Sequence, residues 1–216
     1  TYVYFIKNRH INPTNICINR CGLCAFSKDK GEKGSYSMTL NEVMEAARKS
    51  EKGTTEFHMV GGLNPELDLN YYITLLRLLK KEFPDIHIQA FTAVEIDYIA
   101  SISDLSIREV LMLLREAGLG SLPGGGAEIF NISVRMSICD KKISGERWLE
   151  VMETAHSLGI KSNATMLYGH LESYMDRVDH LKRLRELQDR TNGFQSFIPL
   201  SFHPQNTTIN KHTIKK

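Results

Sequence analysis

The chain has 216 residues, of which 42% are hydrophobic and 24% are charged. This composition is typical of one soluble domain that buries a full core. The net charge is only +2, from 27 basic and 25 acidic residues. Proteins that bind nucleic acids or anionic membranes carry a larger positive surplus, so we expect neither partner here and predict a small-molecule substrate.

The N-terminal residues and the cysteine content indicate the compartment. No stretch approaches the roughly 20 apolar residues of a membrane span. Residues 1–7 have neither the basic start nor the long apolar core of a signal peptide. Four unevenly spaced cysteines do not form a secreted disulfide framework. We therefore expect a cytoplasmic protein, and the absence of an initiator Met indicates a fragment.

Segments with strand patterns alternate with segments that have helical patterns. Capping boxes at 39–42 and 106–109 mark two helix starts. The pattern predicts strands at 11–15, 56–60, 86–91, within 121–129, at 161–168 and at 195–202. It predicts helices at 39–49, 69–83, 106–118, 148–158 and 173–190, with a short turn or helix at 94–102.

Such alternation produces parallel strands joined by right-handed crossovers, either in an open doubly wound sheet or in a barrel. A partial (β/α)6 TIM-like barrel fits best over residues 1–204. Residues 205–216 are polar and aperiodic, which predicts a loop or the truncated start of a further segment. The unusual motifs fall at expected carboxyl ends of strands, where β/α barrels gather their sites.

Three cysteines, Cys17, Cys21 and Cys24, lie within eight residues after the first predicted strand. Thiolates favour zinc, copper(I) or iron-sulfur clusters. A structural zinc site needs four ligands, and only the remote Cys139 remains, which we interpret as a buried thiol. A cubane cluster held by three cysteines leaves one iron open for chemistry. Incidental or zinc-binding cysteines are the alternative.

The spacing C-x3-C-x2-C resembles the signature of the radical S-adenosylmethionine (SAM) superfamily. This resemblance implies that the three cysteines hold a [4Fe-4S] cluster and that SAM binds its fourth iron. Leu23 replaces the aromatic residue that often precedes the last cysteine, and an aliphatic side chain there still packs against adenine. The whole chain is similar to the aminofutalosine (aminodeoxyfutalosine) synthase family of menaquinone biosynthesis, on the stretches 11–17, 90–96, 121–130, 162–170 and 197–200.

The resemblance implies the chemistry. A reduced cluster cleaves SAM, a consumed co-substrate, into methionine and a 5′-deoxyadenosyl radical. The radical adds to the enol ether of 3-[(1-carboxyvinyl)oxy]benzoate, and rearrangement with loss of carboxylate gives aminodeoxyfutalosine. An electron donor such as flavodoxin or ferredoxin is the implied protein partner. Family members extend beyond both ends of this chain, so it corresponds to their barrel portion.

The residues that would contact SAM lie at glycine-rich strand ends. Gly61 and Gly62 match the superfamily position where bare backbone approaches the amino and carboxylate groups of SAM, although a plain turn is the alternative. By resemblance, Glu128 contacts SAM, and the adjacent glycines allow close approach of the backbone. We group the following with the cofactor site: Leu23, Gly61, Gly62, Gly124, Gly125, Gly126, Glu128 and Asn163.

Three histidines, His58, His170 and His203, lie at or near predicted strand ends. The implied substrate carries two carboxylates, so a histidine is expected to bind one of them or to relay a proton. His170 leads this catalytic group, and each histidine taken singly has a structural alternative. Thr92 and Glu95 are weaker candidates, as is Arg135 for pairing with a carboxylate.

Two other kinds of function stay open at this stage. One is a related radical SAM enzyme, of the dehypoxanthine futalosine cyclase or deazaflavin-cofactor synthase type, which shares much of this barrel. The stretch Leu122–Gly126 favours the aminodeoxyfutalosine synthase family over these. The other is a non-catalytic zinc or iron-sulfur module.

Overall fold

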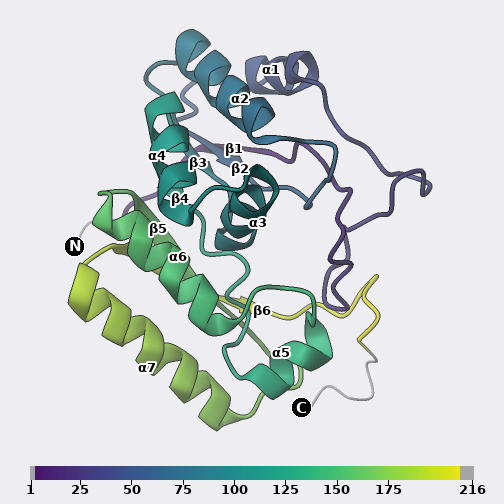
Figure 1. Ribbon diagram of the computed structural model, residues 1–216, viewed down its shortest axis with the longest axis vertical. Coiled ribbons are helices and arrows are strands. Elements are labelled where there is room, and N and C mark those ends of the chain that lie inside the picture. Colours follow the sequence, from purple (N-terminus) through teal and green to yellow (C-terminus); the bar gives the residue numbers. More distant parts are fainter. Residues whose placement is uncertain (1–2, 210–216) are drawn as a thin grey trace.

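The computed structural model describes residues 3–209. Strands and helices alternate along them as the sequence pattern predicts (Figure 1). The strands are β1 (Asn8–Ile11), β2 (Glu56–Met59), β3 (His87–Ala90), β4 (Ser121–Leu122), β5 (Lys161–Tyr168) and β6 (Phe194–Ser201). The helices are α1 (Leu40–Arg48), α2 (Leu69–Glu82), α3 (Ala93–Ser103), α4 (Ile107–Ala117), α5 (Ile132–Ile138), α6 (Gly145–Ser157) and α7 (Tyr174–Thr191).

The six strands form one parallel sheet in the order β1-β2-β3-β4-β5-β6. Helices connect each strand to the next and cover one side of the sheet, which curves into a half-barrel (Figure 1). The predicted partial (β/α)6 barrel is therefore confirmed over the residues described. All carboxyl ends of the strands meet at one edge, because parallel strands joined by crossovers run in one direction.

The two faces of the sheet differ in polarity because side chains alternate along each strand. Phe57 and Met59 of β2 point to the helices and are fully buried, whereas His58 between them points to the other side. Ile88 and Ala90 of β3 pack with the helices in the same way, and Gln89 faces the opposite side. We call the helix-covered side the convex face and the other side the concave face.

Helices are held on the convex face by apolar stripes and start where capping boxes predict. Thr39 with Glu42 and Ser106 with Glu109 both form reciprocal capping boxes. A third box, Thr92 with Glu95, starts α3, so residues 94–102 belong to a full helix. The core of the convex face centres on large apolar side chains from several elements, including Phe57, Leu75, Leu76, Leu79, Ile99, Leu111 and Trp148.

The first strand departs most from the prediction, and several other boundaries shift by one to three residues. The first strand is Asn8–Ile11 and not 11–15, and Pro13, which has no amide hydrogen to donate to a ladder, lies just beyond it. The fourth strand lies within 121–129 as predicted, but it covers only Ser121–Leu122 because Pro123 and three glycines follow. Helix α5 was missed: its seven residues are too few to give a clear helical period.

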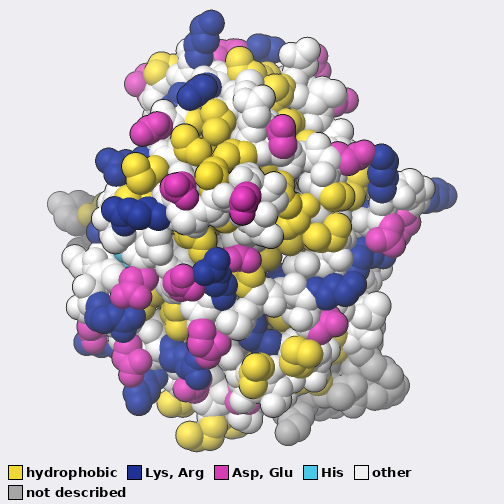
Figure 2. All heavy atoms as spheres, viewed as in Figure 1, with side chains coloured by type: hydrophobic (Ala, Val, Ile, Leu, Met, Phe, Trp, Pro, Cys, Tyr) yellow, Lys and Arg dark blue, Asp and Glu magenta, His cyan; other side chains and the backbone are white. Residues whose placement is uncertain are grey.

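The surface of the helix side carries mixed charges, and apolar side chains gather over its upper part (Figure 2). Figure 2 shows Lys and Arg side chains interspersed with Asp and Glu over α6 and α7. Several of these charges pair between the two helices, as Arg183 does with Glu146 and Arg190 with Glu153. No described helix has the length and apolar character required to cross a membrane.

Candidate radical SAM site

The three clustered cysteines lie on the loop that follows β1, at the carboxyl edge of the sheet. All three are free thiols; Cys21 is buried, while Cys17 and Cys24 are half-buried. Main-chain hydrogen bonds fix the loop: the amide of Cys17 donates to the carbonyl of Lys28 at 3.1 Å, and that of Leu23 donates to Ile138 at 3.2 Å. The loop is therefore ordered by bonds that leave the thiols free.

The environment of Cys21 shows how the thiols affect one another. The pKa of the Cys21 thiol is raised to about 12, chiefly by burial; the Lys142 ammonium lowers it and the neighbouring cysteines add to the rise. A metal ligand must be the thiolate, so iron binding has to displace these protons. Within residues 3–209, no three His, Cys, Asp or Glu side chains group around a single ion. Three free thiols on one loop fit a cubane cluster, in which each cysteine binds a different iron.

Cys139 lies near the loop without belonging to it. Its side chain is 1% exposed and packs in a small apolar cluster with Cys21, Ile138 and Phe202. The predicted role as a buried, hydrophobe-like thiol therefore agrees with its position. Residues 205–209 also reach this region, since the amide of Thr208 donates to the carbonyl of Gly22 at 3.0 Å. The rest of the predicted tail, 210–216, lies outside the described residues.

Gly61 and Gly62 lie directly against the cysteine loop. The amide of Gly62 donates to Thr14 at 3.0 Å, and the amide of Ile18 donates to Leu63 at 3.1 Å, so the two segments are joined. A Cβ atom on Gly62 would lie 2.1 Å from the carbonyl oxygen of Ile16. Glycine is thus required at 62 by close packing. The same test at Gly61 finds only ordinary contacts, at 3.5 Å or more.

Glu95 holds the backbone of the glycine pair through a hydrogen bond with Gly61. Its Oε1 accepts from the amide of Gly61 at 2.9 Å, and its Oε2 accepts from the amide and hydroxyl of Thr92. Burial raises the pKa of this carboxyl to about 7. Both amides of the glycine pair are therefore already used. Among the described residues, no hydrogen bond reaches the two glycine carbonyls, which are the groups left to accept from a ligand.

The glycine run at 124–126 is packed into the protein. A Cβ on Gly124 would lie 2.8 Å from the backbone of Ala164, and Gly126 has a φ of +86°. The carbonyl of Gly125 accepts from the indole of Trp148 at 3.1 Å. Close packing of this loop against β5 and α6 therefore accounts for the glycines without a ligand that approaches the backbone.

Glu128 follows that run with a left-handed φ of +46° and forms an ion pair with Lys142. Both side chains are mostly buried. Burial alone would raise the pKa of Glu128, but the Lys142 ammonium holds it below its ordinary value. The charge of Lys142 also lowers the pKa values of the Cys21 thiol and of Glu95. Sequence analysis missed Lys142, which belongs to no motif.

The arginine considered for a carboxylate is used internally. Arg135 is buried and donates to the carbonyls of Ala127 at 2.6 Å and of Ile129 at 3.1 Å. The guanidinium therefore shapes the loop that carries Glu128 and is not free to bind a substrate carboxylate.

The three candidate histidines have different environments. His170 is buried; its Nε2 donates to the carbonyl of Leu167 at 3.0 Å, and its Nδ1 accepts from the amide of Leu171 at 2.7 Å. His203 is exposed just beyond β6. His58 lies on the concave face. No hydrogen bond or ring contact joins two of the three within residues 3–209, so they do not form one group.

Polar side chains on the concave face form a connected wall. His58 Nδ1 lies 2.9 Å from Gln89 Oε1, and Asn163 Nδ2 donates to the same oxygen at 3.4 Å. Asn163 Oδ1 accepts from Ser196 at 2.8 Å, and Gln89 Nε2 donates to Ser121 at 3.2 Å. We call these five residues the concave wall. Sequence analysis placed Asn163 with the cofactor and missed Gln89, whose only signal is a polar residue inside an apolar strand.

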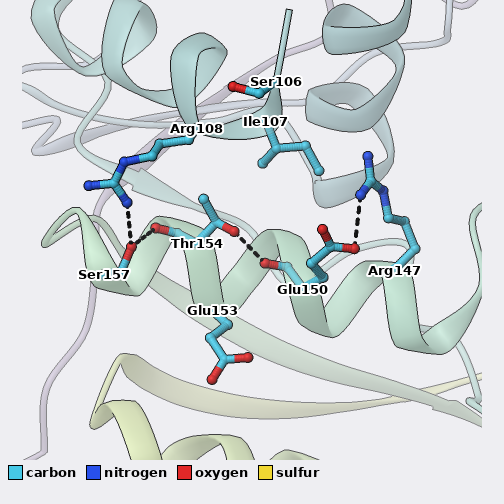
Figure 3. Close-up of a pocket in the computed structure, with 8 residues that line it drawn as sticks. All are labelled: Ser106, Ile107, Arg108, Arg147, Glu150, Glu153, Thr154 and Ser157. Carbon is cyan, nitrogen blue, oxygen red and sulfur yellow. Dashed lines mark hydrogen bonds and ion pairs between the residues drawn. The ribbon is translucent and has the colours of Figure 1, made fainter.

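A groove on the convex face is unrelated to this site. It runs between α4 and α6, and Arg108, Arg147 and Glu150 are among the side chains that line it (Figure 3). Its lining includes no strand residue and no residue of the cysteine loop. The chemistry-bearing groups of the chain instead lie at the carboxyl edge and on the concave face.

Comparisons with known proteins agree with this arrangement. The chain is 46% identical to aminodeoxyfutalosine synthase of Thermus thermophilus over 99% of its length and 58% of the relative's. It is 44% identical to 5-amino-6-(D-ribitylamino)uracil–L-tyrosine 4-hydroxyphenyl transferase of Methanopyrus kandleri, over 96% of its length and 57% of the relative's. The chain thus spans somewhat more than half the length of these relatives.

A solved structure shows the same fold. The crystal structure of methylornithine synthase superposes with a TM-score of 0.76 at 16% identity, covering 95% of this chain and 56% of that one. Residues 11–184 match the Radical SAM superfamily. Proteins of this superfamily use a [4Fe-4S] cluster, SAM, a small-molecule substrate and an external reductant, so the cofactor predictions are confirmed for the family. The chain belongs to the radical SAM superfamily.

Proposed function

We propose that this chain is the barrel portion of an aminodeoxyfutalosine synthase. In this reaction the 5′-deoxyadenosyl group of SAM is joined to 3-[(1-carboxyvinyl)oxy]benzoate to give aminodeoxyfutalosine, a step of menaquinone biosynthesis. The observation that carries the proposal is the match to the Thermus thermophilus synthase across 99% of the chain. The ordered cysteine loop above a polar concave face supports it.

Different residues of the cysteine loop would hold the cluster and SAM. We propose Cys17, Cys21 and Cys24 as the ligands of the [4Fe-4S] cluster, with Leu23 packing on the adenine of SAM. When bound and reduced, the cluster supplies the electron that cleaves SAM. A flavodoxin or ferredoxin is the proposed donor. The protein must then hold the reactants in register and exclude other hydrogen donors.

The hydrogen-bond pattern supports a narrower role for the glycine pair than the one predicted from the sequence. Both amides are occupied, so the carbonyls of Gly61 and Gly62 remain, and carbonyls accept hydrogen bonds from an ammonium group. We propose that they hold the amino group of SAM. Lys142 forms an ion pair with Glu128, and its positive charge lowers the pKa of the Cys21 thiol. We propose that this pair faces the charged amino-acid end of SAM.

The positions and hydrogen bonds of the three histidines lead us to propose a different role for each. Both ring nitrogens of His170 bond to the main chain, so a role in shaping the loop after β5 suits it better than proton transfer. His203 keeps its place as a candidate at the rim. His58, on the concave wall, is the histidine best placed to meet a substrate.

A related reaction is the second candidate, because the Methanopyrus kandleri transferase is nearly as similar at 44% identity. One experiment separates the two. The anaerobically reconstituted chain is incubated with SAM, a reductant and either 3-[(1-carboxyvinyl)oxy]benzoate or L-tyrosine with 5-amino-6-(D-ribitylamino)uracil. Aminodeoxyfutalosine, identified by mass, supports the proposal. Turnover of tyrosine with release of 5′-deoxyadenosine would replace it with the second candidate.

A further inference from the structure

We propose that Gln89 fixes His58 as the Nδ1–H tautomer, so that the concave wall presents a neutral hydrogen-bond acceptor and selects ligands that bring a hydroxyl or amino donor to it. This rests on the proposed function only in taking the concave face as the substrate side. It departs from the sequence prediction that a histidine of this group binds a substrate carboxylate or relays a proton.

The placement of His58 follows from the strand pattern. It lies in register with His10 on β1 and with Gln89 on β3, all on the concave face. Its side chain is 27% exposed. Within residues 3–209 its Nδ1 contacts Gln89, whereas its Nε2 has no hydrogen-bond partner and is not among the buried atoms that lack one. Nε2 is therefore open on the concave side.

The direction of the hydrogen bonds determines which nitrogen carries the proton. Gln89 Nε2 donates to Ser121, and Gln89 Oε1 accepts from Asn163, so Oε1 requires a donor from His58 as well. That donor is Nδ1–H. If donor and acceptor were exchanged in every hydrogen bond of the concave wall, the His58 proton would lie on Nε2 instead.

Glu56 selects between these two directions. Its Oε1 lies 4.0 Å from His58 Nδ1, on the same face two residues earlier in β2. A carboxylate near Nδ1 favours a proton on that nitrogen. Burial lowers the pKa of His58, and His10 lowers it further, so the ring stays neutral. Nε2 then carries a lone pair toward the ligand.

The wall is rigid enough to hold this arrangement. Gln89 is 4% exposed and Ser121 is 1% exposed, so the amide cannot rotate into solvent. Ser121 also bonds His87 Nε2 at 2.7 Å, which fixes the far end of the chain of bonds. A lone pair on Nε2 repels a carboxylate and accepts from a hydroxyl or amino group. Carboxylates of the substrate must therefore be bound by other groups.

The tautomer is measured directly. In the reconstituted chain labelled with ¹⁵N-histidine, long-range ¹H–¹⁵N correlation spectra distinguish the two tautomers, and the His58→Asn variant assigns the signal. We expect His58 as Nδ1–H at pH 7 in the wild-type chain. Gln89→Leu leaves only Glu56, 4.0 Å away, beside Nδ1 and is expected to give a measurable Nε2–H population, whereas Gln89→Glu should keep Nδ1–H. A wild-type ring protonated on Nε2, or on both nitrogens, would overturn the proposal.

The controls isolate Gln89. His156 bonds Thr191 and Ser162 through its two nitrogens and lies outside the wall, so its signal should be the same in every variant. If Gln89→Leu does not fold, the wild-type and Gln89→Glu spectra still show which tautomer His58 adopts. Because these readouts require no turnover, a failure here is distinct from a failure of the proposed reaction.

The ligand class is tested with two probes of similar size, phenol and benzoate. Phenol should shift the His58 Nε2 signal and bind at least about tenfold more tightly than benzoate, equivalent to about 1.4 kcal/mol. In Gln89→Leu this preference should be lost. An equal shift with benzoate, or none with phenol, would overturn the ligand class.

Discussion

The two faces of the sheet are built from the same short strands, yet they have different roles. On β2, Phe57 and Met59 are fully buried under helices, and His58 between them faces the open side. On β3, Ile88 and Gln89 are both shielded from solvent, one among apolar side chains and one in a hydrogen-bonded chain. Burial alone therefore does not distinguish a residue that stabilises this half-barrel from one that serves the site. The distinction lies in the partners, which are apolar side chains for Ile88 and polar side chains for Gln89.

The largest expected effect concerns the cysteine loop, which borders both faces. Replacing any one of Cys17, Cys21 or Cys24 with Ala should abolish both the cluster and turnover, because three ligands are the minimum on this loop. Iron and sulfide analysis after anaerobic reconstitution should give about four of each per wild-type chain and far less in these variants. Cys139→Ala is the matched control and should retain the cluster. Retained turnover in a loop variant would contradict the ligand assignment.

The glycine pair provides a sharper contrast between neighbours. Gly62→Ala places a Cβ 2.1 Å from the carbonyl oxygen of Ile16, so the cysteine loop must move and most of the iron should be lost. Gly61→Ala meets only ordinary contacts and should reconstitute like the wild type. Iron content at equal protein concentration measures both. Equal iron in the two variants would show that the loop tolerates displacement.

Adjacent residues on β2 test the difference between the faces. Phe57→Ala should lower the free energy of unfolding by about 3–5 kcal/mol, since it leaves a cavity in the convex core. His58→Ala should cost less, about 1 kcal/mol, because it removes one hydrogen bond from a partly exposed side chain. Urea unfolding monitored by circular dichroism compares them. Similar losses would mean that the concave wall also carries the fold.

A further expected effect is a pH dependence of stability from His180 on α7. This ring is buried, stacks on Phe130 with centroids 3.9 Å apart and donates from Nε2 to Thr165. Burial lowers its pKa from 6.5 to about 4. Between those values the unfolded chain binds the proton and the folded chain does not, so stability falls as pH drops, by up to about 3 kcal/mol.

His180→Phe tests this, because it keeps an aromatic ring on Phe130 and removes the titration. Urea unfolding of the reconstituted wild type at pH 7, 6 and 5 should show a steeper loss than the variant. An identical slope in both chains would assign the acid sensitivity to other groups.

Much of the fold could be predicted because its signals are local. Capping boxes at Thr39 and Ser106 and the left-handed Gly118 mark helix ends through bonds within a few residues. The eight-residue strand β5 was predicted with its bounds intact, since a long strand has a clear pattern. Two-residue β4 was predicted only as lying within 121–129, and seven-residue α5 was missed, because such short elements owe their form to neighbours distant in sequence.

The sequence by itself determined the cysteine spacing, the family resemblance and the order of strands and helices, because each depends on residues close together in the chain. Only the tertiary structure decided that Arg135 and His170 are used internally, that Lys142 pairs with Glu128, and that Gln89 holds His58. These contacts join residues from separate elements. Their geometry follows from how parallel strands align side chains across the sheet, which no local pattern records.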